Sequence, residues 1–168
     1  MPTLTKTLNS KNFIILGIDP GYEKLGIAVL EKKNTKETLL YSECFKTKKE
    51  TPYEERLLAV GRKVEEIISK YSPTALAIEN LFVSNNQKTA MKVGEVRGVI
   101  LFLATMSGLS VHEYTPLQVK IALTGYGKSE KRQVASMVEK ILKIPKRKVE
   151  DDEMDAIAIA LTGSASIR

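Results

Sequence analysis

The chain has 168 residues, of which 43% are hydrophobic and 27% charged, and its formal net charge is +6. This length and composition suit one domain with a hydrophobic core, and they exclude a disordered tail. The chain has no apolar run near the ~18 residues that cross a bilayer, and its single cysteine, Cys44, cannot form an internal disulfide. We therefore expect a soluble, cytoplasmic protein with no membrane partner.

The first predicted elements are three strands. Residues 13–18 form an apolar run that ends in the turn sequence Asp19-Pro20-Gly21, and two further strand-like runs follow at 25–30 and 39–45. Short connections between them favour a meander. Residues 1–12 are polar and lack the apolar stretch of a signal peptide, so we expect a flexible extension there.

A helix and a fourth strand come next. Apolar residues at helical spacing predict a helix from Pro52 to about Tyr71, and the apolar run 74–78 predicts a strand that ends at Glu79. Because a helix precedes this strand, we expect it to pair in parallel. If its partner is the first strand, Asp19 and Glu79 leave the sheet at the same edge.

The remaining pattern predicts one more strand among helices. Expected in chain order are a helix over 84–107, a strand over 110–114, a short helix over 116–123, a helix capped by Ser129 that ends at Pro145, and a helix from about Asp151 to Leu161, with a tail over 163–168. The fold class is therefore α/β, with a mixed sheet in a single domain over residues 13–162.

Five carboxylates crowd into six residues, from Glu150 to Asp155. Two like charges ~4 Å apart repel by about 4 kcal/mol at an effective dielectric of 20. Capping of a helix N-terminus and its dipole account for Asp151. Asp155, however, shares a helix face with Asp152 and leads into a wholly apolar segment, so it needs a partner.

Two more acids stand at the ends of predicted strands. Asp19 alone is typical of a turn, but Glu79 interrupts an apolar stretch where uncompensated burial raises its pKa or costs several kcal/mol. Together with Asp152 and Asp155 they could be compensated by hard divalent cations, and an all-carboxylate site suits Mg²⁺ or Mn²⁺. A pair of such ions ~3.5–4 Å apart supports in-line phosphoryl displacement.

Positive charge is concentrated just before the acidic run. Residues 117–148 carry nine bases and two acids, which indicates a surface for nucleic-acid phosphates rather than a merely solvated helix face. The candidate nucleic-acid-binding residues are Lys120, Lys128, Lys131, Arg132, Lys146, Arg147 and Lys148 in this segment, with Lys88 and Lys92 earlier in the chain.

An aromatic residue and two glycines complete the candidates. Phe82 follows the fourth strand and either stacks on an unpaired base or packs in the core. Gly94 and Gly98 lie on one face of the predicted helix 84–107, whose second half contains the apolar residue Phe102. This face is either a dimer interface or a surface that packs on the sheet.

Several motifs stand in the order and spacing of a known family: Ile15-Leu16-Gly17-Ile18-Asp19-Pro20-Gly21, Ala77-Ile78-Glu79, Arg97-Gly98, Gln118-Val119-Lys120, Gly127-Lys128-Ser129-Glu130-Lys131 and Asp152–Ala160. Over about residues 13–162 the chain resembles RuvC, the bacterial Holliday-junction resolvase family of the RNase H-like superfamily. The resemblance implies a five-stranded mixed sheet, a three-strand meander plus two parallel strands, flanked by helices. It also implies a homodimer that resolves four-way DNA junctions in recombination and repair by paired, Mg²⁺-dependent nicks, and that acts with RuvA and RuvB.

The resemblance assigns roles to individual residues. Asp19, Glu79, Asp152 and Asp155 would hold two Mg²⁺ ions and position the attacking water. Lys120 and Lys131 fall where the family has functional lysines near the scissile phosphate, and Phe82 where it has a stacking aromatic. A two-fold junction also needs two equivalent sites, which a homodimer provides. The twelve residues before the first strand depart from the family pattern.

Three other functions compete with this interpretation. An actin-like or sugar-kinase ATPase would need a second Asp-x-Gly turn, which this sequence does not contain. A nucleic-acid-binding module without catalysis would account for the basic residues but not for the four acids. A nuclease with another specificity, such as RNA–DNA hybrids or a step in RNA processing, fits the same fold and stays open.

Overall fold

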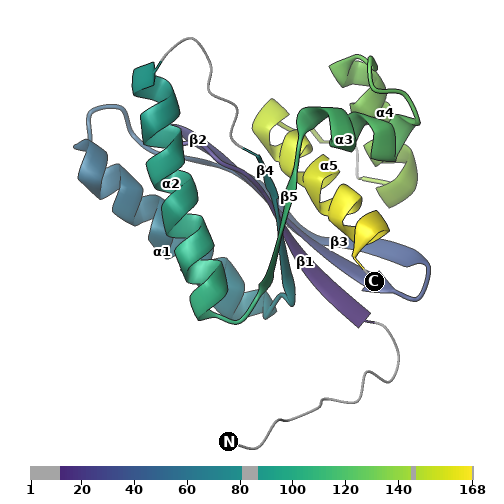
Figure 1. Cartoon of the computed structure of the whole chain (residues 1–168), viewed down its shortest axis with the longest axis horizontal. Helices are drawn as coiled ribbons and strands as arrows, with labels where there is room; N and C mark the ends of the chain where they lie inside the picture. The colour runs from purple at the N-terminus through teal and green to yellow at the C-terminus, as the bar shows by residue number, and fades with distance from the viewer. Residues whose placement is uncertain (1–11, 81–86, 145–146, 168) are drawn as a thin grey trace, which may run out of the picture.

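The computed structural model describes residues 12–80, 87–144 and 147–167 (Figure 1). Within these ranges the strands are β1 (Asn12–Asp19), β2 (Lys24–Lys33), β3 (Lys36–Lys46), β4 (Ala75–Glu79) and β5 (Ser110–Tyr114). The helices are α1 (Tyr53–Tyr71), α2 (Gln87–Met106), α3 (Pro116–Thr124), α4 (Lys131–Leu142) and α5 (Asp151–Ser166). Phe82, Lys146 and residues 1–11 lie outside the described ranges.

The strands form one mixed sheet in the order β3-β2-β1-β4-β5. The first three are an antiparallel meander, and β4 pairs in parallel with both β1 and β5. Ile18 lies opposite Ile78, so the next residues, Asp19 and Glu79, leave the sheet at the same edge. The predicted fold class and this shared edge are confirmed.

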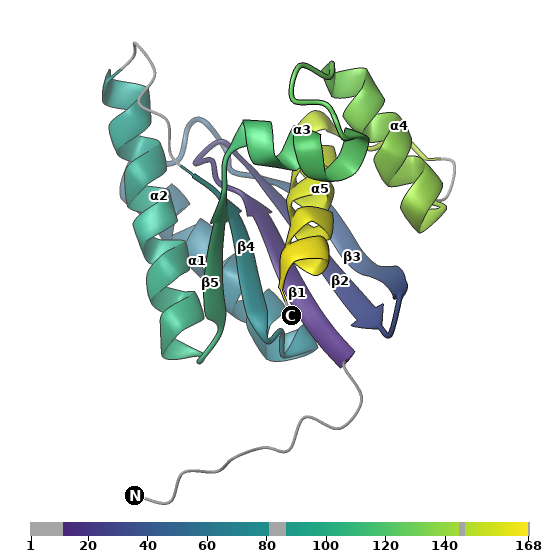
Figure 2. The same ribbon diagram turned by 45° about the vertical axis from the view of Figure 1, so that its right-hand side comes forward.

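Helices cover both faces of the sheet. The cluster of buried apolar side chains beneath α1 and α2 fills one face, and a second cluster fills the other face beneath α5, α3 and α4. Figure 2 shows α5 lying against the sheet, with α3 and α4 outside it. The apolar run of α5, from Ala156 to Leu161, is buried throughout, as its sequence predicts.

Two glycines allow α5 to lie this close to the sheet. A Cβ atom on Gly26 of β2 would lie 1.9 Å from the Asp152 backbone oxygen, and one on Gly17 of β1 would lie 2.5 Å from the Ala156 oxygen. Real Cβ atoms do not approach other atoms so closely, so larger residues at either position would displace the helix. The first turn of α5 is thereby seated directly over β2.

Helix starts and ends differ in detail from the sequence prediction. Ser129 does not cap α4: it is buried, and its Oγ donates to the Tyr126 backbone oxygen at 2.6 Å. Glu130 is the N-cap instead, and its backbone N–H donates to Gln133 Oε1 at 2.7 Å. Helix α5 continues to Ser166, through residues that the sequence assigned to a tail.

The start of α5 also differs from the expectation. Glu150 is its N-cap, with no side-chain cap hydrogen bond, and Asp151 is the first helical residue rather than the cap. Asp151 still lies where its charge favours the helix dipole. Among the described residues, no helix is long and apolar enough to cross a membrane.

Candidate active site

Three elements bring the four predicted acids together. Asp19 ends β1, Glu79 ends the neighbouring strand β4, and Asp152 and Asp155 lie in the first turns of α5. The charges of Glu79, Asp155 and Asp152 all act on Asp19, so the four carboxyl groups form one cluster although they come from distant parts of the sequence.

The cluster holds more negative charge than its surroundings compensate. Burial, followed by the charges of the other three acids, raises the pKa of Asp19 to about 8. Burial and the charge of Asp155 also raise the pKa of Glu79, which is hydrogen-bonded to Asp19. Burial raises the pKa of Asp155 despite the opposing effect of Lys131. At neutral pH the Asp19–Glu79 pair therefore retains a proton, and a bound cation would compensate the same charge.

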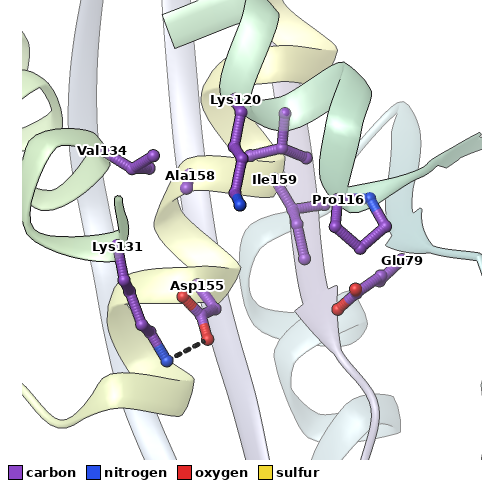
Figure 3. Close-up of a pocket in the computed structure, with 9 residues that line it drawn as sticks. Glu79, Pro116, Lys120, Lys131, Val134, Asp155, Ala158 and Ile159 are labelled. Atoms are coloured by element: carbon purple, nitrogen blue, oxygen red, sulfur yellow. Dashed lines mark ion pairs between the residues drawn. The ribbon is translucent and has the colours of Figure 1, made fainter. Parts of the chain in front are cut away.

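Lysines partly neutralise the acids on α5. Lys131 Nζ lies 2.8 Å from Asp155 Oδ2, the ion pair drawn in Figure 3, and 3.6 Å from Asp151 Oδ2. On the other side of the helix start, Lys24 Nζ lies 3.8 Å from Asp152 Oδ2. These ion pairs are accessible to solvent, so a stronger ligand of the carboxylates can displace them.

A cavity of about 240 Å³ opens beside the acids. Figure 3 shows Lys120 and Lys131 reaching into the space that also receives the carboxylates of Glu79 and Asp155. Its remaining walls are apolar and come from α3, α4 and α5: Pro116, Val119, Val134, Ala158 and Ile159. The structure thus places the two predicted catalytic lysines next to the acids.

The donor set fits a hard divalent cation. Every donor is a carboxylate oxygen, the ligand that Mg²⁺ and Mn²⁺ prefer, and the buried negative charge lacks a sufficient counterion. Within the described ranges, no three His, Cys, Asp or Glu side chains already stand as ligands of one ion. Asp19 and Glu79 bind each other and Asp155 binds Lys131, so a metal would replace the shared proton and this ammonium group.

The predicted DNA-binding residues fall into different surroundings. Lys128, before α4, and Arg132, in its first turn, are exposed, and Arg132 Nε lies 2.7 Å from Glu130 Oε2. Lys88 is exposed in the first turn of α2, whereas Lys92 Nζ lies over the Tyr22 and Tyr53 rings, 5.2 and 5.0 Å from their centroids. Lys148 lines a groove with Lys24, Lys46 and Lys131, beside residues 150–152.

Arg147, near the end of the basic segment, has a partner within the protein. Its guanidinium group forms hydrogen bonds to the buried carboxylate of Glu153, at 3.2 Å from Nη1 and 2.5 Å from Nη2. The Arg147 side chain is still 45% exposed, and its contact with DNA stays a prediction.

Two lysines of the groove were missed by the sequence reasoning. Lys24 begins β2 and Lys46 ends β3, and the Nζ of Lys46 lies 2.5 Å from Glu150 Oε1. The sequence offered one clue to these lysines: each stands next to the end of a predicted strand, and the two strands are neighbours in the meander. In the sheet, Lys24 lies opposite Lys46. Cys44 Sγ lies 3.9 Å from Asp152 Oδ2, and burial and this charge raise the pKa of the thiol to about 11, which keeps it unreactive.

The candidate dimer face is open to solvent. Phe102 is 63% exposed, and a Cβ atom on the exposed Gly98 would meet nothing within 4 Å, whereas Gly94 is partly buried. Beside them lies a groove between α1 and α2, lined mainly by Leu57, Leu58, Gly61, Val99, Phe102 and Leu103. The sheet does not cover Gly98 or Phe102, so packing on the sheet does not explain these residues.

Comparison with known proteins agrees with this site. The family model described as crossover junction endodeoxyribonuclease RuvC matches residues 15–163. Proteins of that name from Desulfitobacterium hafniense and Thermosipho melanesiensis are 42% and 44% identical, over 92% and 87% of this chain and 93% of each relative. A structure of T. thermophilus RuvC in complex with a Holliday junction substrate matches with a TM-score of 0.85 and 37% identity, over 90% of this chain and 93% of that chain.

Identity of this extent over most of both sequences establishes the family, and the structural match establishes an RNase H-like fold. Nucleases of this family are metal-dependent, in agreement with the acidic cluster. The chain belongs to the RuvC family of crossover junction endodeoxyribonucleases.

Proposed function

We propose that this protein resolves four-way DNA junctions as a homodimer, by metal-dependent hydrolysis of one phosphodiester bond on each of two strands. The carrying observation is the cluster of Asp19, Glu79, Asp152 and Asp155, whose mutual repulsion in a partly buried site a divalent cation would relieve. The substrate is inferred from the similarity to T. thermophilus RuvC, whose structure holds a Holliday junction.

The four carboxylates would hold two Mg²⁺ ions, for which Mn²⁺ can substitute. When bound, Mg²⁺ stabilises the charge of the phosphoryl transition state and lowers the pKa of the attacking water. Asp19 and Glu79 would release their shared proton on the approach of the metal. Lys131, freed from Asp155, would turn with Lys120 toward the non-bridging oxygens of the scissile phosphate.

Phosphate contacts along the groove would orient the strand. The groove beside the start of α5 is lined by Lys24, Lys46, Lys131 and Lys148. Two more exposed bases, Lys128 and Arg132, stand close to Lys131 in the sequence. Such contacts give affinity without sequence information, as expected of an enzyme that recognises DNA structure. Phe82 remains the candidate for stacking on an unpaired base.

A second copy of the chain is the proposed occupant of the groove between α1 and α2. Exposed Leu58 and Phe102 make this face apolar, and a two-fold junction requires two equivalent sites. A C₂ pair that meets here would present one acidic cluster to each of two strands. RuvA and RuvB, which move the branch point, are the further proposed partners, on the basis of family membership.

A cleavage gel tests the proposal. The purified protein is incubated with a four-way junction, a linear duplex and an RNA–DNA hybrid, with and without Mg²⁺. We expect paired nicks in the junction alone, and only with metal. Equal cleavage of all three substrates would refute junction selectivity, and preferential cleavage of the hybrid would establish the rival nuclease specificity.

Variants then test the site. Asp155→Asn should abolish cleavage yet bind the junction nearly as well as wild type, because phosphate contacts carry affinity. The matched control is Asp151→Asn, which makes the same chemical change to a side chain that is 86% exposed. Retained cleavage in Asp155→Asn, or loss in Asp151→Asn of the same extent, would contradict the proposed metal site.

A further inference from the structure

Glu153 lies between two proposed metal ligands in sequence, yet it belongs to different surroundings. Its side chain is only 5% exposed, whereas those of Asp152 and Asp155 are 31% and 35% exposed. Burial of an ionised carboxylate is costly unless charged and hydrogen-bonding partners compensate it. Such a residue in the first turn of α5 therefore needs an explanation separate from the metal site.

Two partners from different segments compensate Glu153. Arg147, in the segment before α5, donates from Nη1 to Oε2 at 3.2 Å and from Nη2 to Oε1 at 2.5 Å. Ser42, in the middle of β3, donates from Oγ to Glu153 Oε1 at 2.6 Å and accepts from Arg147 Nη2 at 2.9 Å. We call these three residues the bracket.

The bracket joins three pieces of chain at one point. It fixes the first turn of α5 to strand β3 and to the segment that leads into the helix. A bidentate arginine–carboxylate pair constrains direction as well as distance, because two parallel hydrogen bonds define the orientation of both groups. The helix therefore cannot rotate about its axis without breaking several of these bonds.

The ion pairs of Glu150, Asp152 and Asp155 involve carboxylate side chains that are 31–35% exposed, whereas the side chain of Glu153 is 5% exposed. The N-cap residue Glu150 makes no side-chain cap hydrogen bond, and its ion pairs to Lys24 and Lys46 are exposed to solvent. The close contacts with Gly26 and Gly17 limit how far the helix lies from the sheet, whereas the bracket adds directional hydrogen bonds to the first turn. Rotation of this turn would move Asp152 and Asp155 together.

We infer that Ser42, Arg147 and Glu153 are positioning residues, which set the orientation of Asp152 and Asp155 toward the metal without touching metal or DNA. The inference rests on the proposed metal site. Outer contacts that orient metal ligands typically change metal affinity by about 10–100-fold. The bracket would act through the helix backbone rather than through a hydrogen bond to a ligand.

The test measures metal binding in the absence of DNA, by the loss of the free Mn²⁺ signal in electron paramagnetic resonance. The variants are Ser42→Ala, Glu153→Gln and the double variant Arg147→Met/Glu153→Leu. The double variant replaces the ion pair with apolar side chains and so avoids an unpaired buried charge. The matched control is Ser164→Ala, which removes a 2.9 Å hydrogen bond between α5 and Glu37 of β3 at the far end of the same helix.

We expect each bracket variant to bind Mn²⁺ about tenfold or more weakly than wild type. Saturating Mg²⁺ should restore most junction cleavage, and junction affinity in EDTA should stay within about twofold of wild type. Ser164→Ala should bind Mn²⁺ as wild type does, even where its melting temperature falls as far as that of Ser42→Ala. This comparison separates orientation of the ligands from general stability.

Three outcomes would overturn the inference. Wild-type Mn²⁺ affinity in Ser42→Ala and Glu153→Gln would show that the bracket does not orient the ligands. An equal loss in Ser164→Ala would reduce the effect to stability. A tenfold loss of junction affinity in EDTA for the double variant, with unchanged Mn²⁺ binding, would make Arg147 a DNA contact. Failure of the wild type to bind Mn²⁺ would instead refute the proposed metal site itself.

Discussion

Replacement of Asp19 by asparagine should make the metal-free protein more stable while abolishing its activity. Burial, followed by the charges of Glu79, Asp155 and Asp152, raises the pKa of Asp19 to about 8 from its ordinary value of 3.8. Asparagine has nearly the same shape and carries no charge at any pH. The variant therefore removes the electrostatic cost of the cluster without leaving a cavity.

The sign and size of this effect follow from proton linkage. The pKa of Asp19 is higher in the folded protein than in the unfolded chain, so protonation of Asp19 favours the folded state. This stabilisation is complete below about pH 4 and is lost as the pH rises to about 8. Each pH unit in this window accounts for up to about 1.4 kcal/mol. At pH 7 the upper limit is about 4 kcal/mol, and relaxation of the site should reduce the gain to about 1–4 kcal/mol.

The assay is thermal unfolding in EDTA across pH 4–9, for wild type, Asp19→Asn and the exposed control Asp151→Asn. A gain of 1 kcal/mol corresponds to about 2–4 °C for a domain of this size. The advantage of Asp19→Asn over wild type should be near zero at pH 4, grow to about pH 8 and then level off. Asp151→Asn should track wild type throughout.

Metal should reverse the order of stability. Wild type should gain stability that rises with the logarithm of the Mg²⁺ concentration above the Kd, whereas Asp19→Asn would lack one proposed ligand and should gain less. The reasoning is refuted if Asp19→Asn unfolds below wild type in EDTA at pH 7, or if its advantage does not change with pH. Either result would mean that the carboxylates are not mutually repulsive in the folded protein.

Three further changes test other parts of the structure. Gly26→Ala places a Cβ atom 1.9 Å from the Asp152 oxygen, so it should lower the unfolding free energy by several kcal/mol in denaturant titrations; unchanged stability would contradict the seating of α5. Phe102→Glu should convert dimer to monomer in sedimentation, with loss of paired nicks, whereas a persistent dimer would place the interface elsewhere. Lys131→Met removes the 2.8 Å ion pair with Asp155 and should slow single-turnover cleavage by about 10²-fold or more with little change in junction affinity; an unchanged rate would remove Lys131 from the reaction.

Much of the acidic cluster could be predicted from chain topology. The helix before β4 favours a parallel crossover, and once β4 pairs with β1, as the structure shows, Asp19 and Glu79 lie at one edge. The spacing of Asp152 and Asp155 puts them on one helix face. These steps need only the period of helices and the pairing rules of strands.

Side-chain pairs between distant segments could not be predicted in the same way. Arg147 and Glu153 were each assigned to the charge run in which they stand, but burial of Glu153 joins them across that boundary. Ser42 carries no charge and gave no signal. The choice between Ser129 and Glu130 as N-cap similarly depends on which side chain is buried, and this is a property of the packed fold rather than of local sequence.

The position of α5 in the chain has a consequence for the timing of activity during synthesis. Two of the four acids lie on this helix, which is the last element of the described structure, while Asp19 ends the first strand. Nascent β1 and β4 can pair on the ribosome without the acids of α5, so a partly made chain would lack a complete metal site. If these four acids form the metal site as proposed, cleavage requires that α5 has been made and has docked on the sheet.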